Sequence, residues 1–175
     1  MLSVFKGEKI IPTGIQHGTL TVLMKGMPLE ITTYRIDGDY ADHRRPENVA
    51  YTRDLAEDLA RRDFTVNAMA WHPGEGLIDL YGGQADLERR IMRAVGDPLL
   101  RFEEDGLRLM RLVRFATVLV FDYDPATAAA AKASAHLLKH ISKERIQVEL
   151  NKMLLAPFVG KGLFDLREFG LLSEV

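Results

Sequence analysis

No cysteine occurs among the 175 residues, which excludes disulfide bonds and thiolate metal sites built from the chain's own side chains. No run approaches the roughly 20 consecutive apolar residues that a membrane-spanning helix needs. The first stretch, MLSVFKGEKI, lacks the long apolar core of a signal peptide. These absences predict a soluble protein of the reducing cytoplasm that does not engage a membrane.

An excess of positive charge is also absent, because the sequence has 23 lysines and arginines and 25 aspartates and glutamates. The net charge of -2 argues against a protein that binds polyanions over its whole surface, so phosphate contacts must come from local clusters of arginine. Apolar residues make up 47% of the chain, enough to bury the core of one domain or of two small ones.

The first part of the chain has the pattern of a small sheet. Residues 19–35 place β-branched and apolar residues on both sides of Lys25-Gly26, which predicts a β-hairpin. Residues 36–49, IDGDYADHRRPENV, are rich in Asp, Gly, Arg and Pro and lack a hydrophobic period, so an exposed loop is expected there.

A helix is expected to follow this loop, beginning near Leu55. Short apolar runs around Trp71 and over residues 77–80 are bounded by HPGEG and YGG, and they predict the last strands of the sheet. Strand patterns stop after Asp97-Pro98.

Helical spacing dominates the rest of the chain. Apolar residues recur at i, i+3 and i+4 in three segments, residues 104–119, 125–138 and 142–155. Ser142 is a suitable N-cap for the third helix. The change of pattern predicts an α+β protein with a boundary near Gly96.

Three arginines at a spacing of three, Arg108, Arg111 and Arg114, lie in the first of these helices, and Asp105 precedes them by one turn. On one continuous helix, Asp105 and Arg108 would project side by side. A solvated charged face, worth only a few tenths of a kcal/mol, is one interpretation. The apolar flanking residues favour another, a site for a planar or anionic ligand. A carboxylate beside a forked donor can match the Watson-Crick edge of a nucleobase.

Five segments carry a resemblance to a known family, and they follow its order: PTGIQHGTLTV (residues 12–22), TTYRIDGDYADHRRPENV (32–49), RRDFTVNAMA (61–70), LIDLYGGQADLERRIMRAVGDPLLRFEEDGLRLMRLVRFA (77–116) and ISKERIQVELNKML (141–154). On these residues the chain resembles the bacterial class II tRNA nucleotidyltransferase and poly(A) polymerase family, truncated at both ends. The resemblance implies a partial head domain with the polymerase β-like nucleotidyltransferase sheet, residues 1–96, and an all-helical nucleotide-binding neck, residues 97–175.

The resemblance further implies a template-independent transferase that adds CMP and AMP, taken from CTP and ATP, to the 3′ end of tRNA. Asp105 and Arg108 would read the base edge as a protein template. Arg111 and Arg114 would support that site or reach the triphosphate, and Arg62 would bind the nucleotide or its ribose.

Asp63 and Asn67 lie in the same motif as Arg62, and Asn67 suits a sugar hydroxyl or loop backbone. For Asp63, a helix N-cap over FTVNAMA is an equal alternative to nucleotide contact. The segment DHRRP, with Asp42, Arg44 and Arg45, corresponds to the family's flexible loop for switching from C to A addition. Its alternative is a solvated turn.

Two further motifs are expected to play structural parts. Gly82, Gly83, Asp86 and Arg90 resemble the family's hinge between head and neck, and their alternative is a tight turn with an N-cap. Glu144 and Arg145 match a neck motif that supports the nucleotide helix.

The family's metal site has no counterpart among these segments. Family members hold two Mg²⁺ ions on a DxD pair upstream of the segment that resembles PTGIQHGTLTV, and the sequence starts just before that segment. We therefore predict no catalytic or metal residue in this chain. A partner chain or a missing segment would supply the carboxylates.

Other acidic pairs are poor substitutes. Asp37 and Asp39 follow the hairpin and Asp122 and Asp124 follow the nucleotide helix, so all four are better explained as turn residues. Glu30 is a weak candidate for an auxiliary third carboxylate.

Two functional hypotheses remain open from the sequence. The chain is part of a CCA-adding enzyme, or it is an inactive nucleotide- or RNA-binding fragment or a subunit of a split enzyme. Within the enzymatic class, A addition and poly(A) synthesis compete with CCA addition.

Overall fold

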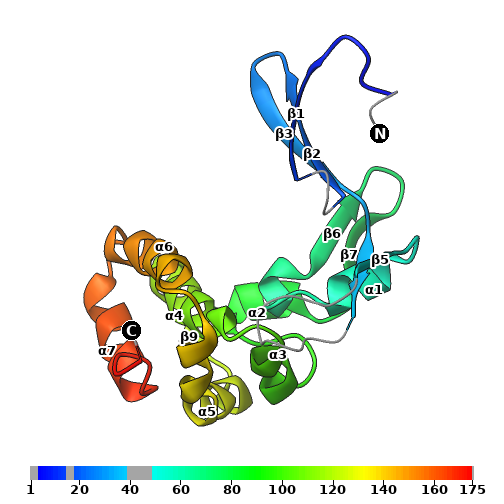
Figure 1. The fold of residues 1–175 in the computed structure, drawn as a ribbon. Helices are drawn as coiled ribbons and strands as arrows, with labels where there is room; N and C mark the ends of the chain where they lie inside the picture. Colours follow the sequence, from blue (N-terminus) through cyan, green and yellow to red (C-terminus); the bar gives the residue numbers. More distant parts are fainter. Residues whose placement is uncertain (1–3, 15–17, 39–48, 175) are drawn as a thin grey trace.

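The computed structural model describes residues 4–14, 18–38 and 49–174. Figure 1 shows an elongated arrangement in which a small sheet lies at one end and a group of helices at the other. We call the described residues up to Gly96 the head and those from Asp97 the helical half. Among the described residues, no helix is long and apolar enough to cross a membrane.

The first sheet is antiparallel, with strand order β1 (Lys9–Gly14), β2 (Thr19–Met24) and β3 (Met27–Thr32). The predicted hairpin is confirmed, because β2 and β3 pair from Thr19↔Thr32 to Met24↔Met27. Lys25 and Gly26 form its turn with φ angles of 50° and 82°. Two successive positive φ angles are the geometry that matches the twist of a two-residue hairpin.

The prediction of a loop over residues 36–49 is wrong at both ends of that range. Strand β4 (Arg35–Asp37) pairs antiparallel with β5 (Val49–Tyr51). Three-residue strands are too short to show a hydrophobic alternation, so the pattern gave no indication of them. Asp42, Arg44 and Arg45 lie outside the described residues.

The remaining head elements follow closely on one another. Helix α1 (Leu55–Ala60) starts at its N-cap Asp54, whose carboxylate accepts a hydrogen bond from the Ala56 amide, as expected for a helix near Leu55. A 3₁₀ turn, η2 (Thr65–Asn67), leads into the antiparallel pair β6 (Met69–His72) and β7 (Gly76–Asp79). This pair confirms the strands predicted around Trp71 and residues 77–80.

Helix α2 (Gly83–Arg89) packs tightly on η2. A Cβ on Gly83 would lie 2.2 Å from the Thr65 carbonyl oxygen, so only glycine allows this approach of two backbones. The α2 N-cap is Gly82, with φ of 73°, and Asp79 accepts hydrogen bonds from the Gly83 and Gln84 amides at 2.8 and 2.9 Å. The expected tight turn is present, and its capping carboxylate belongs to Asp79.

A two-residue parallel ladder joins the two parts of the chain. Strand β8 (Ile91–Met92) pairs with β9 (Asp122–Tyr123), which follows the helix that carries Arg108, Arg111 and Arg114. The prediction that strands stop after Asp97 is therefore wrong, because a two-residue strand has no periodicity to detect. The division of the chain near Gly96 stays a prediction.

The helical half contains α3 (Pro98–Glu104), α4 (Leu107–Leu119), α5 (Pro125–Ala133), η3 (Ala135–His140), α6 (Lys143–Leu154) and α7 (Val159–Glu168). The helix expected over residues 104–119 is wrong at its start. Asp105 has an extended backbone with φ of -145° and separates α3 from α4. At the next residue, a Cβ on Gly106 would lie 3.0 Å from the Leu137 carbonyl oxygen, so glycine allows η3 to approach the break closely.

Two other helices differ from the prediction in detail. The segment expected over residues 125–138 divides at Ser134 into α5 and the 3₁₀ helix η3. Ser142 is the N-cap of α6 as predicted, but its side chain makes no capping hydrogen bond. Helix α7 was not predicted.

The main core lies in the helical half, around α4, which packs against α6 and α7. Buried apolar side chains from α4 include Leu109, Leu112 and Val113, all fully enclosed. Phe64 and Met92 extend this core into the head. Helix α4 is thus held on one side by helices and on the other by the head.

Candidate functional site

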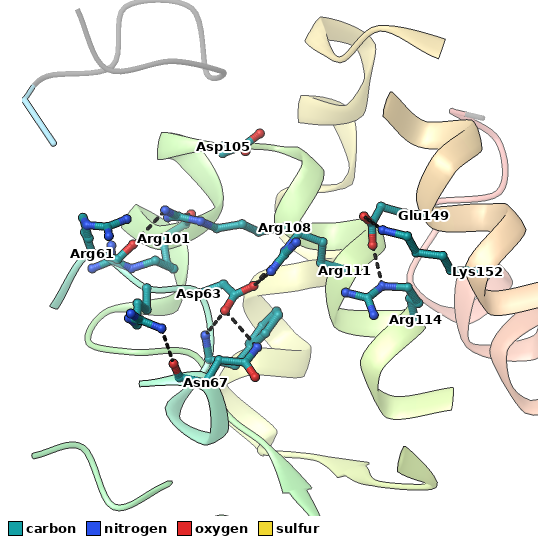
Figure 2. A network of polar contacts seen from close by, with 12 residues as sticks. Arg61, Asp63, Asn67, Arg101, Asp105, Arg108, Arg111, Arg114, Glu149 and Lys152 are labelled. Carbon is teal, nitrogen blue, oxygen red and sulfur yellow. Dashed lines mark hydrogen bonds and ion pairs between the residues drawn. The ribbon is translucent and has the colours of Figure 1, made fainter. Parts of the chain in front are cut away.

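The site predicted from the sequence gathers around α4, where the arginines point to different partners. Each step of three residues turns a helical side chain by about 60°, so Arg114 points about 120° away from Arg108. Figure 2 shows Arg108 and Arg111 directed toward head residues and Arg114 toward α6. The three arginines therefore do not form one uniform wall.

Arg108 is held by acceptors from three places. Its Nη1 donates to the Arg101 carbonyl oxygen at 2.8 Å and to the Glu104 carboxylate, and its Nη2 donates to the Arg61 carbonyl oxygen at 3.1 Å. Its side chain is only 9% exposed. A guanidinium has five N–H donors, so these described contacts leave Nε–H and one Nη2–H for a ligand.

Asp105 lies at the break between α3 and α4, where it contacts Arg145 of α6. Its Oδ2 accepts from Arg145 Nη2 at 2.8 Å, and its Oδ1 accepts from Arg145 Nη1 at 3.3 Å and from the Leu107 amide at 3.1 Å. The Arg108 amide donates to the Asp105 carbonyl oxygen at 2.9 Å, but among the described contacts no hydrogen bond or ion pair joins their side chains, which Figure 2 shows apart. The expectation that both project from one helix is wrong because the helix breaks at Asp105.

Arg145 was predicted to support the nucleotide helix, and its contact with Asp105 agrees with that role. An ionised carboxylate has about four acceptor positions, and the described contacts of Asp105 use three. One position, on Oδ2, remains for a ligand. Glu144, the other residue of that motif, is exposed.

Arg111 connects α4 to the head through Asp63. The Nε and Nη2 atoms of Arg111 lie 2.7 and 2.6 Å from Asp63 Oδ2. The other oxygen of Asp63 accepts from the Phe64 amide at 2.9 Å and from Asn67 Nδ2 at 3.2 Å. The N-cap of η2 is Phe64, so the alternative reading of Asp63 as a helix N-cap is wrong.

Arg114 belongs to the helical half. Its Nε lies 2.5 Å from Glu149 Oε2, and its guanidinium carbon lies 3.6 Å from the centroid of the Phe115 ring. Glu149 is buried and also accepts from Lys152 at 3.5 Å. This pair fixes α4 against α6.

Arg62 is the most exposed of the predicted nucleotide-binding arginines, with 37% of its side chain accessible. Its Nη1 donates to the Asn67 carbonyl oxygen at 3.0 Å, and its Nη2 donates to Asp58 at 3.2 Å. Its Nε is buried and has no hydrogen-bond partner among the described residues. Arg62, Asp63 and Asn67 thus form one connected group beside α4.

Asp58 is a buried carboxylate of this hydrogen-bonded group that sequence reasoning missed. It is 1% exposed and accepts hydrogen bonds from Arg61, Arg62 and the Arg35 amide. Burial works to raise the pKa of Asp58, but the hydrogen bonds and charge of Arg61, with help from Arg35 and Arg62, bring it below its usual value. An acid at i with arginines at i+3 and i+4 was the available sequence signal.

Asp86, from the predicted hinge motif, is buried. Its Oδ2 accepts from Thr65 Oγ1 at 2.6 Å and from Arg93 Nε at 2.9 Å. Asp86 therefore does not cap α2, and it ties α2 to η2 and β8. Arg90 ends α2 with φ of 57°.

The acidic side chains do not assemble into a metal site. Among the described residues, no group of three or more His, Asp or Glu side chains could hold a metal ion. Asp124 caps α5, accepting from the Thr127 amide and hydroxyl at 2.9 Å, and Glu30 is exposed on β3. The side chains that the structure describes do not fit the two Mg²⁺ ions of the family, and Asp39 lies outside the described residues.

Two family models match the chain. The model described as Poly A polymerase head domain matches residues 2–93. The model described as probable RNA and SrmB-binding site of polymerase A matches residues 120–175.

Curated relatives and solved structures agree with these models. The chain is 48% identical to a CCA-adding enzyme of Bacillus cytotoxicus and 50% identical to one of Levilactobacillus brevis, over 95% and 94% of its own length. It covers only 42% and 41% of those relatives.

A CCA-adding enzyme of Bacillus stearothermophilus in complex with CTP superposes with a TM-score of 0.87 at 42% identity, over 95% of this chain and 40% of that one. A tRNA nucleotidyltransferase complexed with a primer tRNA and an ATP analog gives a TM-score of 0.79 at 30% identity, over 99% of this chain and 48% of that one.

Proposed function

We propose that the chain, which belongs to the poly(A) polymerase head domain family, forms the nucleotide-selecting part of an enzyme that adds CMP and AMP to tRNA 3′ ends. The curated relatives named above are CCA-adding enzymes. The CTP and tRNA complexes of similar solved structures support this choice. CCA addition is preferred to poly(A) synthesis because the relatives named above are CCA-adding enzymes.

The observation that carries the proposal is the uncommitted hydrogen-bonding capacity of Arg108 and Asp105. Cytosine and adenine each present an amino donor beside a ring-nitrogen acceptor. Asp105 would accept from the amino group and Arg108 would donate to the ring nitrogen. Uracil and guanine present N–H and carbonyl groups there. The Arg108 N–H would then face the ring N–H of the base, and the Asp105 carboxylate would face its carbonyl oxygen.

Exposure separates the roles of the other arginines. Side chains of Arg62 and Arg111 are 37% and 34% exposed, and we assign to them contacts with the ribose or the triphosphate. The Arg114 side chain is 12% exposed and paired with Glu149, so it would support α4. Asp63 and Asn67 would hold Arg111 and Arg62 in place, and Asp42, Arg44 and Arg45 would act in the change from C to A addition.

A second function applies to the chain alone, as a nucleotide-binding module that does not transfer. The absence of a metal-binding cluster among the described residues favours it. In the family's chemistry Mg²⁺ activates the primer hydroxyl and neutralises the pyrophosphate. Under our proposal, the carboxylates that hold it come from additional polypeptide.

Calorimetry with CTP, ATP, UTP and GTP tests the proposed selection. We expect the chain to bind CTP and ATP more tightly than UTP and GTP, and Arg108→Ala to weaken CTP and ATP binding roughly tenfold to a hundredfold. Arg167→Ala, an exposed arginine of α7, is the matched control and should leave binding unchanged. Equal affinity for all four nucleotides in the unmodified chain would contradict the proposal.

Incorporation of labelled CMP into tRNA in the presence of Mg²⁺ separates the two functions. Binding without incorporation identifies the nucleotide-binding module. Incorporation identifies a transferase whose metal ligands lie among residues that we assigned other roles.

A further inference from the structure

Asp58 has no part in the contacts proposed for the nucleotide, yet it is the least exposed of the four carboxylates buried among the described residues. A buried carboxylate is costly unless several donors satisfy it. Its Oδ1 lies 2.5 Å from Arg61 Nη2 and 3.1 Å from Arg61 Nε, and it also accepts from the Arg35 amide at 3.3 Å. Its Oδ2 accepts from Arg62 at 3.2 Å. The principal partner of Asp58 is therefore the side chain of Arg61.

Arg61 has two separate sets of contacts. Its side chain folds back to Asp58 and donates from Nε to the Arg35 carbonyl oxygen at 3.2 Å. Its main-chain carbonyl oxygen accepts from Arg108 Nη2 at 3.1 Å. Arg61 therefore lies between Asp58 and Arg108, with its side chain bound to one and its main-chain carbonyl oxygen to the other.

The Arg61 carbonyl also lies where a cation is favoured. Arg61 is the C-cap of α1, and carbonyl groups at the end of a helix carry partial negative charge. In the described contacts it is the only acceptor that the head offers to Arg108, since the other two come from α3. It accepts from Nη2, the nitrogen that keeps one further N–H for a ligand.

We propose that Asp58 is a positioning residue for nucleobase selection, which acts through Arg61 to fix the direction of the Arg108 guanidinium. The inference rests on the proposed function, because it requires Arg108 to read the base. It goes beyond that function by assigning specificity to a buried residue in α1 that does not contact the nucleotide. Without the Asp58 carboxylate, the Arg61 side chain loses its ion-pair partner, and the Arg108 guanidinium gains freedom to meet a wrong base.

The test is the selectivity of nucleotide binding in Asp58→Asn, measured by calorimetry with CTP and UTP. We expect the ratio of the UTP to the CTP dissociation constant to fall about tenfold. Loss of folding alone lowers the number of binding-competent molecules equally for both nucleotides, and thus leaves this ratio unchanged. The binding stoichiometry reports that loss separately.

Asp165→Asn is the matched control. Asp165 lies on α7 and accepts from Tyr123 Oη and Lys161 Nζ, each at 2.7 Å, so its replacement also disturbs a satisfied carboxylate. It should lower stability and leave the nucleotide ratio unchanged. A ratio that falls equally in both variants would overturn the proposal.

Arg61→Gln provides a second route if Asp58→Asn does not fold. It keeps the Arg61 carbonyl group and removes the anchored side chain, so it should lower the ratio as Asp58→Asn does. The double variant Asp58→Asn/Arg61→Gln should be no less selective than either single variant, because both changes remove the same Asp58–Arg61 ion pair. Unchanged selectivity in Asp58→Asn, or in Arg61→Gln where that variant alone folds, overturns the inference. Absence of selectivity in the unmodified chain overturns the proposed function instead.

Discussion

The head and the helical half are held together by different interactions. Apart from Phe64 and Met92, the buried residues of the main core all lie between Phe102 and Leu171. Three of the four buried carboxylates, Asp58, Asp63 and Asp86, lie in the head, and the fourth, Glu149, lies in the helical half. Among the described residues, the main apolar core thus lies in the helical half and most of the buried carboxylates lie in the head.

This difference indicates that different interactions fix the position of α4 and the orientation of its arginines. Apolar packing fixes the helix because close-packed side chains resist displacement in every direction. Directional hydrogen bonds then orient the arginines of the helix, because their energy depends on donor geometry. The head supplies the Asp63 carboxylate to Arg111 and the Arg61 carbonyl oxygen to Arg108, and the helical half supplies the other acceptors of Arg108 and the Glu149 partner of Arg114. The contrast predicts which substitutions affect stability and which affect selection.

The largest effect is expected at Glu149, the exception within the apolar half. Glu149→Ala leaves Arg114 without its carboxylate in a poorly exposed position, and removal of one partner from such a pair costs about 3–5 kcal/mol. The free energy of unfolding in urea measures this loss. Lys152→Ala is the control, because Lys152 is exposed and contacts the same carboxylate, and it should cost less than about 1 kcal/mol.

A smaller effect is expected where α7 packs on α4. A Cβ on Gly162 would lie 2.5 Å from Thr117 Oγ1 and 2.7 Å from Met153 Sδ, so Gly162→Ala should destabilise the protein by about 1–3 kcal/mol. Gly160 lies in the same helix and a Cβ there would meet nothing within 4 Å. Gly160→Ala should therefore be neutral or stabilising in the same urea titration. Equal destabilisation by both changes would contradict the close approach of α7.

The charged network of the head predicts a loss of stability in acid. The pKa of folded Asp58 lies below its ordinary value of 3.8, so its contribution is present in full above about pH 5 and disappears as the pH falls through the folded pKa. The difference in unfolding free energy between the unmodified chain and Asp58→Asn should shrink over that range. A difference that stays constant down to about pH 2 would show that the Asp58 charge does not stabilise the fold.

The smallest effect is expected at Ser142. Its side chain makes no capping hydrogen bond, so Ser142→Ala should cost about 0.5 kcal/mol or less. Asp124 caps α5 through the Thr127 amide, and Asp124→Ala should cost about 1 kcal/mol. Thermal unfolding of the two variants compares the caps, and an equal cost would mean that Ser142 caps α6 in solution.

Local patterns predicted much of the fold because they depend on neighbours in sequence. The β2–β3 hairpin follows from alternating residues around Lys25-Gly26, and α6 follows from its apolar spacing. The α3–α4 break was missed because the predicted helix was extended from the apolar spacing after Leu107 back across Asp105-Gly106 to Glu104. Gly106 lacks a Cβ and therefore allows Leu137 to lie close to the break. This contact joins segments that are distant in sequence, so hydrophobic periodicity does not reveal it.

The arrangement of the candidate residues was not predictable from the sequence, and their roles stay a prediction. The family resemblance drew attention to Arg62, Asp105 and the arginines of α4. The partners of these residues are remote in sequence, since Arg111 meets Asp63 and Asp105 meets Arg145. Such pairings depend on how the elements pack, so no local spacing could predict them.

The parallel β8–β9 ladder ties the chain that follows α4 to the chain that precedes α3. The amides of Asp122 and Asp124 donate to the carbonyl oxygens of Arg90 and Met92, so the ladder closes a loop of chain that contains both α3 and α4. Helix α4 cannot detach from the head by swinging about Gly96 without breaking these bonds. In hydrogen exchange, the amides of Asp122 and Asp124 should therefore become exposed together with those at the centre of α4, as one cooperative unit spanning both parts of the molecule.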